Sequence, residues 1–240
     1  EAVAKAMQAR IPILGIQAQG LDGRRPPLAD MDAIAALYVS LIREAQPEGP
    51  YFLAGPSQGG LAALEIAQRL VAEGEDVRLL AMLDCWAPGF PRRTSAARRV
   101  RDHAGAMWRR SWRERAAYLK EKATRRLRRL EHGFRTYTYR EAGDEGAIYD
   151  TLLEVQSAYE AAADAYEVRP YPGRVHVFRA LRVPESPGLR FDDPSCGWTA
   201  FARGGVETID VDAEHKDMLD APRVNQFAAA LEALLLALRP

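Results

Sequence analysis

Tyr51-Phe52-Leu53-Ala54-Gly55-Pro56-Ser57-Gln58-Gly59-Gly60 contains the pattern G-x-S-x-G and precedes a stretch with helical apolar spacing. A strand, a sharp turn and a helix in this order hold the serine in a strained conformation at the carboxyl end of the strand, and flanking glycines prevent collisions. The sequence therefore predicts an α/β fold with Ser57 as a nucleophile. The backbone amide of Gln58, at the helix N-terminus, is the candidate oxyanion donor. A glycine-rich turn with an incidental serine is the alternative.

Two further strand ends offer partners for this serine. The apolar run Val77–Leu83 fits a buried parallel strand and ends at Asp84, and the run Val206–Val211 leads within a few residues to His215. Serine, aspartate and histidine then follow the chain order of α/β-hydrolases. In those enzymes the histidine is the general base, and the carboxylate fixes its tautomer and stabilises the imidazolium.

The chain has four histidines, and their contexts single out one of them. His103 and His132 lie in an arginine-rich helical segment. His176 lies within a strand pattern, where its side chain is expected to face a neighbouring layer. His215 is therefore the candidate base.

Stretches spread over nearly the whole chain carry a family likeness: IPILGIQAQG (11–20), QPEGPY (46–51), GPSQGG (55–60), LLAMLDCWAP (79–88), YPG (171–173), GW (197–198) and EHKDML (214–219). Together they resemble the thioesterase domains that terminate nonribosomal peptide and polyketide synthetases. The family places its acid after the strand that follows the elbow helix, where Asp84 stands here. The resemblance implies a catalytic triad of Ser57, Asp84 and His215. It also implies an α/β-hydrolase fold with a mostly parallel central sheet, flanking helices and a helical lid.

The same resemblance predicts one thioesterase domain over residues 1–240, with a core at 1–88 and 167–240 and a lid insertion at about 89–166. The family normally begins with a further strand and a glycine-rich loop that donates a second oxyanion amide. We expect that strand and loop to be absent from this chain, because residues 1–9 look like the helix that follows them. Pro56, Cys85 and Trp86 adjoin Ser57 or Asp84 and are candidate substrate contacts. Cys85 is also a weak rival nucleophile.

The net charge of zero conceals a basic segment, because residues 92–140 hold 17 Lys or Arg and four acids. Apolar residues recur there at helical spacing, so one face packs and the other is basic. The basic face is a solvated surface, a nucleic-acid patch or a docking surface for an acidic carrier domain. Nucleic acid is disfavoured because no aromatic stacking platform is interleaved. The candidate carrier contacts are Arg125, Arg126, Arg128 and Arg129.

Length and composition agree with a single large domain, since 240 residues with 48% hydrophobic content bury a substantial core. No apolar run is long enough to span a bilayer, so we expect no membrane partner. Cys85 and Cys196 form no disulfide framework or metal spacing, which fits a reducing cytoplasm. No metal or bound cofactor is expected, because dinucleotide, P-loop and clustered ligand motifs are absent. Two more helices are expected, at 147–166 and 224–238.

The functional hypothesis is release of an acyl, peptidyl or polyketide chain from the 4′-phosphopantetheine thioester of a carrier protein. The chain passes through an acyl-enzyme on Ser57 and leaves by hydrolysis or macrocyclisation. One alternative is a stand-alone or editing serine (thio)esterase. The alternative from another class is a catalytically silent module that binds a carrier.

Overall fold

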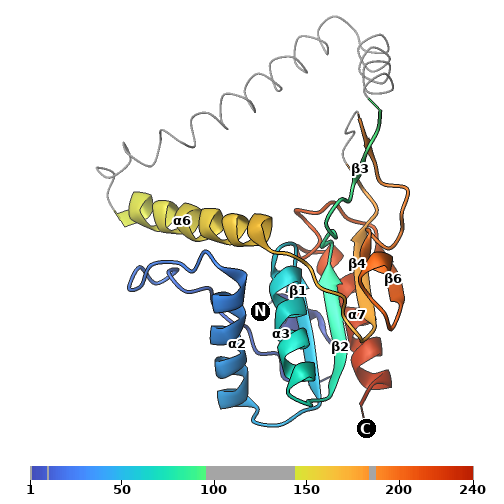
Figure 1. Cartoon of the computed structure of the whole chain (residues 1–240), viewed down its shortest axis with the longest axis horizontal. Helices are drawn as coiled ribbons and strands as arrows, with labels where there is room; N and C mark the ends of the chain where they lie inside the picture. Colours follow the sequence, from blue (N-terminus) through green and yellow to red (C-terminus); the bar gives the residue numbers. More distant parts are fainter. Residues whose placement is uncertain (1, 10, 96–143, 184–187, 240) are drawn as a thin grey trace, which may run out of the picture.

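A four-stranded sheet forms the centre of the chain in the computed structural model, which describes residues 2–9, 11–95, 144–183 and 188–239. The strands run in the order β1-β2-β4-β6 (Figure 1), and all neighbours pair in parallel. Their bounds are β1 Tyr51–Pro56, β2 Val77–Leu83, β4 Val175–Ala180 and β6 Val206–Val211. The predicted parallel sheet is confirmed, and its carboxyl ends share one edge.

Helices cover both faces of this sheet (Figure 1). The α-helices of the described ranges are α1 Ala2–Ala6, α2 Met31–Ala45, α3 Gly59–Ala72, α6 Asp144–Ala165 and α7 Arg223–Ala237. The helices α2 and α3 pack together on one face, whereas α1 and α7 pack together on the other. None of the helices in the described ranges is long and apolar enough to cross a membrane.

The strand β2 shows why the sheet needs cover on both sides. Leu80 and Met82 belong to the apolar cluster shared with α3, whereas Leu79 and Leu83 belong to the cluster shared with α7. Side chains of a strand alternate between faces, so a strand with apolar residues at successive positions needs apolar cover on both faces. The apolar run at 79–83 is thus explained by the central place of β2 in the sheet.

A second, small sheet lies beyond the carboxyl edge of the first. It consists of β3 Arg92–Arg93 and β5 Leu189–Arg190, paired antiparallel. The sequence predicts neither of these two strands. Two-residue strands give no periodic signal, and the partner strand lies far away in the chain.

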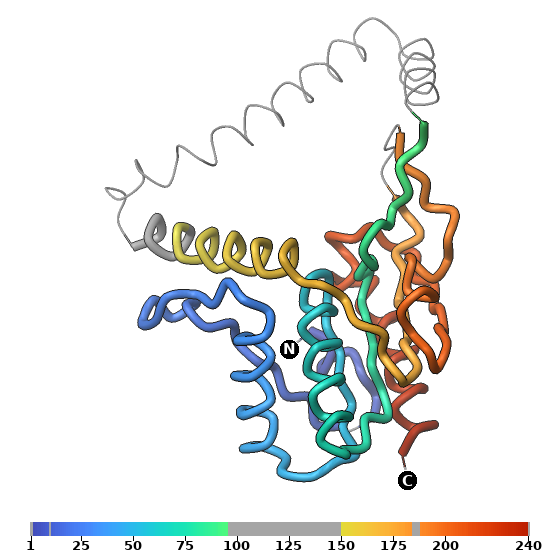
Figure 2. Tube along the Cα trace, in the orientation of Figure 1, coloured from blue at the N-terminus to red at the C-terminus, as the bar shows by residue number. Residues whose placement is uncertain are grey.

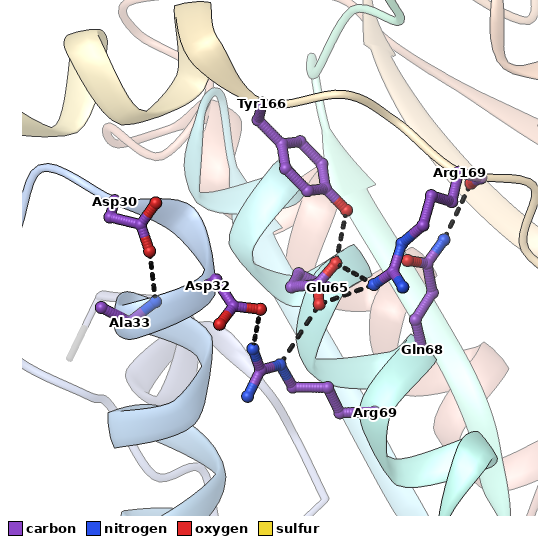
Figure 3. Close-up of polar contacts among 8 residues, drawn as sticks. All are labelled: Asp30, Asp32, Ala33, Glu65, Gln68, Arg69, Tyr166 and Arg169. Atoms are coloured by element: carbon purple, nitrogen blue, oxygen red, sulfur yellow. Dashed lines mark hydrogen bonds and ion pairs between the residues drawn. The ribbon is translucent and has the colours of Figure 1, made fainter.

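The helix α6 lies across the amino-terminal end of α2 (Figure 1), and Figure 2 shows the chain leaving it and running past α3 into β4. A polar group that we call the Glu65 cluster fastens this crossing (Figure 3). Glu65 on α3 accepts hydrogen bonds from Tyr166 Oη at 2.8 Å, from Arg169 Nη2 at 2.8 Å and from Arg69 Nε at 3.2 Å. Arg69 also pairs with Asp32 on α2. The buried carboxylate therefore ties α2, α3 and the end of α6 together.

Candidate active site

The G-x-S-x-G segment forms the predicted sharp turn between β1 and α3. Ser57 has φ of +49°, in the left-handed region that a serine rarely adopts. A Cβ on Gly55 would lie 2.1 Å from the backbone oxygen of Gly59, and one on Gly60 would lie 2.7 Å from Cβ of Cys85. Only glycine fits at either position, so the tightness of the turn is what holds the serine in its strained conformation.

Asp84 occupies the equivalent place on the neighbouring strand. Pro56 and Leu83 are register partners, and the Ser57 amide donates to the Leu83 carbonyl at 2.8 Å. Asp84 therefore follows β2 where Ser57 follows β1, and it too has a positive φ, of +44°. Its side chain is 6% exposed, and its Oδ1 accepts from the Ala180 amide at 3.2 Å. Backbone and side chain together fix one carboxylate oxygen toward β4.

The other carboxylate oxygen of Asp84 meets His215. Nδ1 of His215 lies 2.7 Å from Oδ2 of Asp84, and a carboxylate only accepts, so Nδ1 carries the hydrogen. This hydrogen bond raises the pKa of His215 above its ordinary value, and the Asp84 charge adds to the effect while partial burial opposes it. The ring is about half exposed. Nε2 is thus left as the nitrogen that accepts a proton.

The turn that carries His215 is held by a neighbouring aspartate. The amide of Glu214 donates to Oδ1 of Asp217 at 2.7 Å, and the Asp217 carboxylate pairs with Arg223 at 3.2 Å, at the start of α7. The Asp217 carboxylate therefore fixes the backbone of the turn, while Asp84, which follows β2, supplies the partner of the ring.

Ser57, Asp84 and His215 are brought to one edge of the sheet, but the hydrogen bonds of the described residues include none between Ser57 Oγ and the His215 ring. Catalytic contacts of this kind often tighten only when substrate is bound. The Gln58 amide, at the start of α3, donates to no other group within the described part of the chain. A free amide at a helix N-terminus is suited to bind developing negative charge.

The remaining candidates from the sequence lie around this turn. Pro56 is exposed at the end of β1. Cys85 is 2% exposed and packs beneath α3, and burial raises the pKa of its thiol, which opposes thiolate chemistry. Trp86 is 39% exposed, and its ring centroid lies 6.3 Å from that of His215. Of the three, Pro56 and Trp86 are exposed, and Trp86 is the one whose ring lies near His215.

The other predictions from the sequence concern the histidines, the arginines and metal binding. His176 is buried, as expected for its place in a strand. Arg125, Arg126, Arg128 and Arg129 lie outside the described residues, as do His103 and His132. Within the residues that the structure does describe, no group of three or more His, Cys, Asp or Glu could hold a metal ion.

Sequence reasoning missed two aromatic residues near the site. Phe90 and Phe191 pack edge-on against Trp86, with ring centroids 6.1 and 5.5 Å away. Phe90 lies close to Trp86 in the sequence, so it could have been named with Trp86 as a candidate substrate contact. No local signal marked Phe191, because only the fold brings it to Trp86.

Comparison with known proteins places this arrangement in a family. The family model "Thioesterase domain" matches residues 1–235. A "Dimodular nonribosomal peptide synthase" of Bacillus subtilis (strain 168) is 29% identical over 235 residues, which cover 93% of this chain and 9% of the relative. An "Inactive atromentin synthetase invA4" of Paxillus involutus is 24% identical, over 97% of this chain and 25% of the relative. The chain therefore spans a quarter or less of these two relatives.

A solved structure shows the same fold. The RedJ thioesterase from the prodiginine biosynthetic pathway in Streptomyces coelicolor superposes with a TM-score of 0.64 and 21% identity, covering 97% of this chain and 79% of that one. This likeness confirms the predicted α/β-hydrolase architecture. With a family model that extends over almost its whole length, the chain belongs to the thioesterase domain family.

Proposed function

We propose that this chain is a serine thioesterase that releases an acyl, peptidyl or polyketide chain from a carrier protein. The observation that carries the proposal is the 2.7 Å bond between Asp84 and His215, at the sheet edge where Ser57 is held in a strained turn. An aspartate that fixes the tautomer of a histidine, at the same sheet edge as a half-buried serine, is the arrangement needed for acyl transfer. Ser57 is the nucleophile, His215 the base and Asp84 its orienting partner.

The first half of the reaction transfers the acyl group to the enzyme. Nε2 of His215 takes the Ser57 proton as Oγ attacks the thioester carbonyl, and the Gln58 amide stabilises the resulting oxyanion. Collapse of this intermediate breaks the carbon–sulfur bond. The departing sulfur receives the proton from His215, which leaves an ester on Ser57.

The second half releases the product. A water molecule, or a hydroxyl or amine of the acyl chain, attacks the ester while Nε2 of His215 removes its proton. The carbon–oxygen bond to Ser57 then breaks and the proton returns to Oγ. Water yields a linear acid, whereas an internal nucleophile yields a macrocycle.

The proposed partner is an acyl or peptidyl carrier domain that delivers the substrate on its 4′-phosphopantetheine arm. The names of the two relatives support this, since both are synthases or synthetases much longer than this chain. The hypothesis drawn from the sequence assumes an acidic carrier domain. The basic segment at 92–140 would complement the negative charge of such a domain. The proposed location is the cytoplasm.

Thioester turnover with paired variants tests the proposal. His215→Ala should lower kcat by roughly 10³-fold or more, because the proton acceptor is lost. Lys216→Ala is the matched control, since its exposed side chain lies on the same turn and, within the described part of the chain, pairs with Glu214. Full turnover by His215→Ala would contradict the assignment of the base.

A second function is favoured by the relative whose printed name calls it inactive. A silent module would bind an acyl-carrier domain without releasing its chain. Carrier binding by wild type, with no turnover of any thioester, would identify that module. Turnover of soluble esters as fast as carrier-bound thioesters would instead indicate a stand-alone or editing esterase.

A further inference from the structure

A small pocket opens beside Asp84, on the side of the sheet edge away from Ser57. Its walls include Asp84 and residues 179–181, at the end of β4. The strand β2 lies between β1 and β4, so Asp84 separates this pocket from the nucleophile. Its volume of about 110 Å³ suits one side chain or a short branch rather than a whole acyl chain. We propose that this pocket binds an uncharged apolar or aromatic group of the acyl chain, distant from the reacting carbonyl, and selects substrates by that group.

One wall of the pocket is aromatic. Trp86, Phe90 and Phe191 all line it, and each pair of rings meets edge to face at 5.5 to 6.1 Å. Edge-to-face packing is a favoured arrangement of aromatic rings and stabilises their positions. A rigid aromatic wall therefore favours an aromatic or branched apolar guest.

A second wall of the pocket is aliphatic and open to solvent. Leu181 is 49% exposed and Val183 is 39% exposed, in addition to the 39% exposure of Trp86. Single exposed apolar residues are ordinary, but several around one concavity mark a binding site. Covering them with an apolar group removes this surface from water, which supplies the binding free energy.

The charged residues of the pocket are already paired. Of its described lining residues, only Asp84 and Arg179 are charged. Asp84 is bonded to His215, and Arg179 makes two hydrogen bonds to Asp210, at 2.9 and 3.0 Å. Burial raises the pKa of Cys196 to about 12, so its thiol is neutral. A charged guest would find no free partner and would lose its hydration.

The inference rests on the proposed function, and the test separates the two. Two pantetheine thioesters of equal length and identical reacting ends are compared, one ending in a phenyl group and one in a hydroxyl group. Wild type should prefer the phenyl substrate by about tenfold in kcat/KM, a ratio typical of an apolar pocket. Phe191→Ala should remove most of that preference while both substrates are still turned over.

A second variant guards against misfolding. Leu181→Asp changes a half-exposed side chain, so the fold should persist, and it places a charge on the aliphatic wall. It should also remove the phenyl preference. Leu236→Ala, an equally exposed leucine on α7, is the control and should keep the wild-type ratio. If folded Leu181→Asp keeps the wild-type ratio of kcat/KM between the phenyl and hydroxyl substrates, the proposal is overturned. It is also overturned if Leu181→Asp changes only the stability or the self-association of the protein, because the exposed apolar residues would then be covered by protein rather than by substrate.

A binding measurement keeps the outcome clear if no thioester turns over. Calorimetry measures association of the matching phenyl-ended and hydroxyl-ended amides, which cannot be cleaved. Tighter binding of the phenyl amide to wild type, lost in Leu181→Asp, would support the pocket even though the thioesterase proposal had failed. Equal binding of both amides would overturn the pocket, whatever the turnover.

Discussion

Ser57 and Asp84 both occupy the left-handed backbone region, at the ends of adjacent strands. Such conformations cost of order 1–3 kcal/mol each and persist only where surrounding structure enforces them. The glycines of the elbow provide this enforcement, since their lack of Cβ lets the start of α3 press against β1 and Cys85. Strain at these two residues is therefore part of how the site is positioned.

Gly55→Ala tests the tightness of the elbow. The added Cβ meets the backbone of Gly59 at 2.1 Å and cannot be relieved by a rotamer change. We expect a loss of at least about 3 kcal/mol in the free energy of unfolding, at the upper end of overpacking effects, or failure to fold. Denaturant unfolding measures this.

Gly15→Ala serves as the control for that substitution. Nothing lies within 4 Å of its would-be Cβ, and its φ is not in the left-handed region. Its midpoint of denaturant unfolding should equal that of the wild type. Equal stability of both variants would show that the elbow is looser than described.

Asp84→Asn tests the link between Asp84 and the His215 ring. In wild type the pKa of His215 is raised, mainly by its bond to Asp84. The base must be neutral, so kcat/KM should fall as the pH drops through a value above the ordinary 6.5 of histidine. Asp84→Asn should move this acidic limb of the pH–rate profile to lower pH. It should also reduce kcat by about 10⁴-fold, because the His215 ring is no longer held in the correct tautomer and orientation.

A pH–rate series for both proteins gives the answer. The nearby Asp217→Asn variant removes a carboxylate that touches the backbone of the His215 turn rather than its ring, so its limb should stay closer to wild type. A limb that is unmoved in Asp84→Asn would mean that another group sets the titration.

At the scale of elements, the Glu65 cluster is the clearest connection between the end of α6 and the core (Figure 3). The Glu65 side chain is 3% exposed, whereas that of Arg169 is 64% exposed. Solvent screens Arg169, so most of the contribution comes from keeping the buried carboxylate satisfied. The cluster therefore acts as a fastening of α6 on α2 and α3.

Glu65→Gln tests this fastening with little change of shape. The amide cannot accept from both arginines and Tyr166 at once, so we expect a loss of about 1–3 kcal/mol. In a chain of this size each kcal/mol corresponds to about 2–4 °C in melting temperature. Hydrogen exchange should rise in residues 150–166 more than in β2.

The control for this change is Asp212→Asn. It breaks a bond to Arg182 in which both side chains are more than half exposed, so the melting temperature should not move. Loss of stability in Asp212→Asn comparable to that in Glu65→Gln would refute a special role for the buried cluster.

Elements were predictable from sequence where one local signal was strong. The strands at 77–83 and 206–211 were predicted with the observed bounds, because the first has an apolar run at 79–83 and the second alternates apolar and polar residues. The helix α2 was not predicted, although Asp30 caps it by accepting from the Ala33 amide at 2.8 Å, a signal present in the sequence. The strands β3 and β5 could not be predicted from the sequence, since each is only two residues long.

Across the whole molecule, the candidate site was predictable in part. Topology alone brings the ends of β1, β2 and β6 to one edge, so Ser57, Asp84 and His215 followed from chain order and strand ends. The aromatic wall did not, because contact between Trp86 and Phe191 depends on how the loops fold back. The free Gln58 amide lies where the elbow pattern placed it.

Charge is also a property of the whole chain, since residues 92–140 are strongly basic and the remainder is acidic. Reversing the charge of Arg125, Arg126, Arg128 and Arg129 should raise KM for a carrier-bound thioester and leave a small pantetheine thioester unaffected. Steady-state kinetics with both substrates measures this. Equal effects on both would refute the carrier-docking hypothesis.

The central claim is that Ser57 carries the acyl group, and intact-protein mass spectrometry tests it most directly. Wild type and Ser57→Ala are mixed with an acyl-pantetheine thioester and quenched at short times. We predict a mass increase of one acyl group in wild type, located on Ser57, and none in Ser57→Ala. An adduct of equal yield in Ser57→Ala would contradict the account and point to another nucleophile.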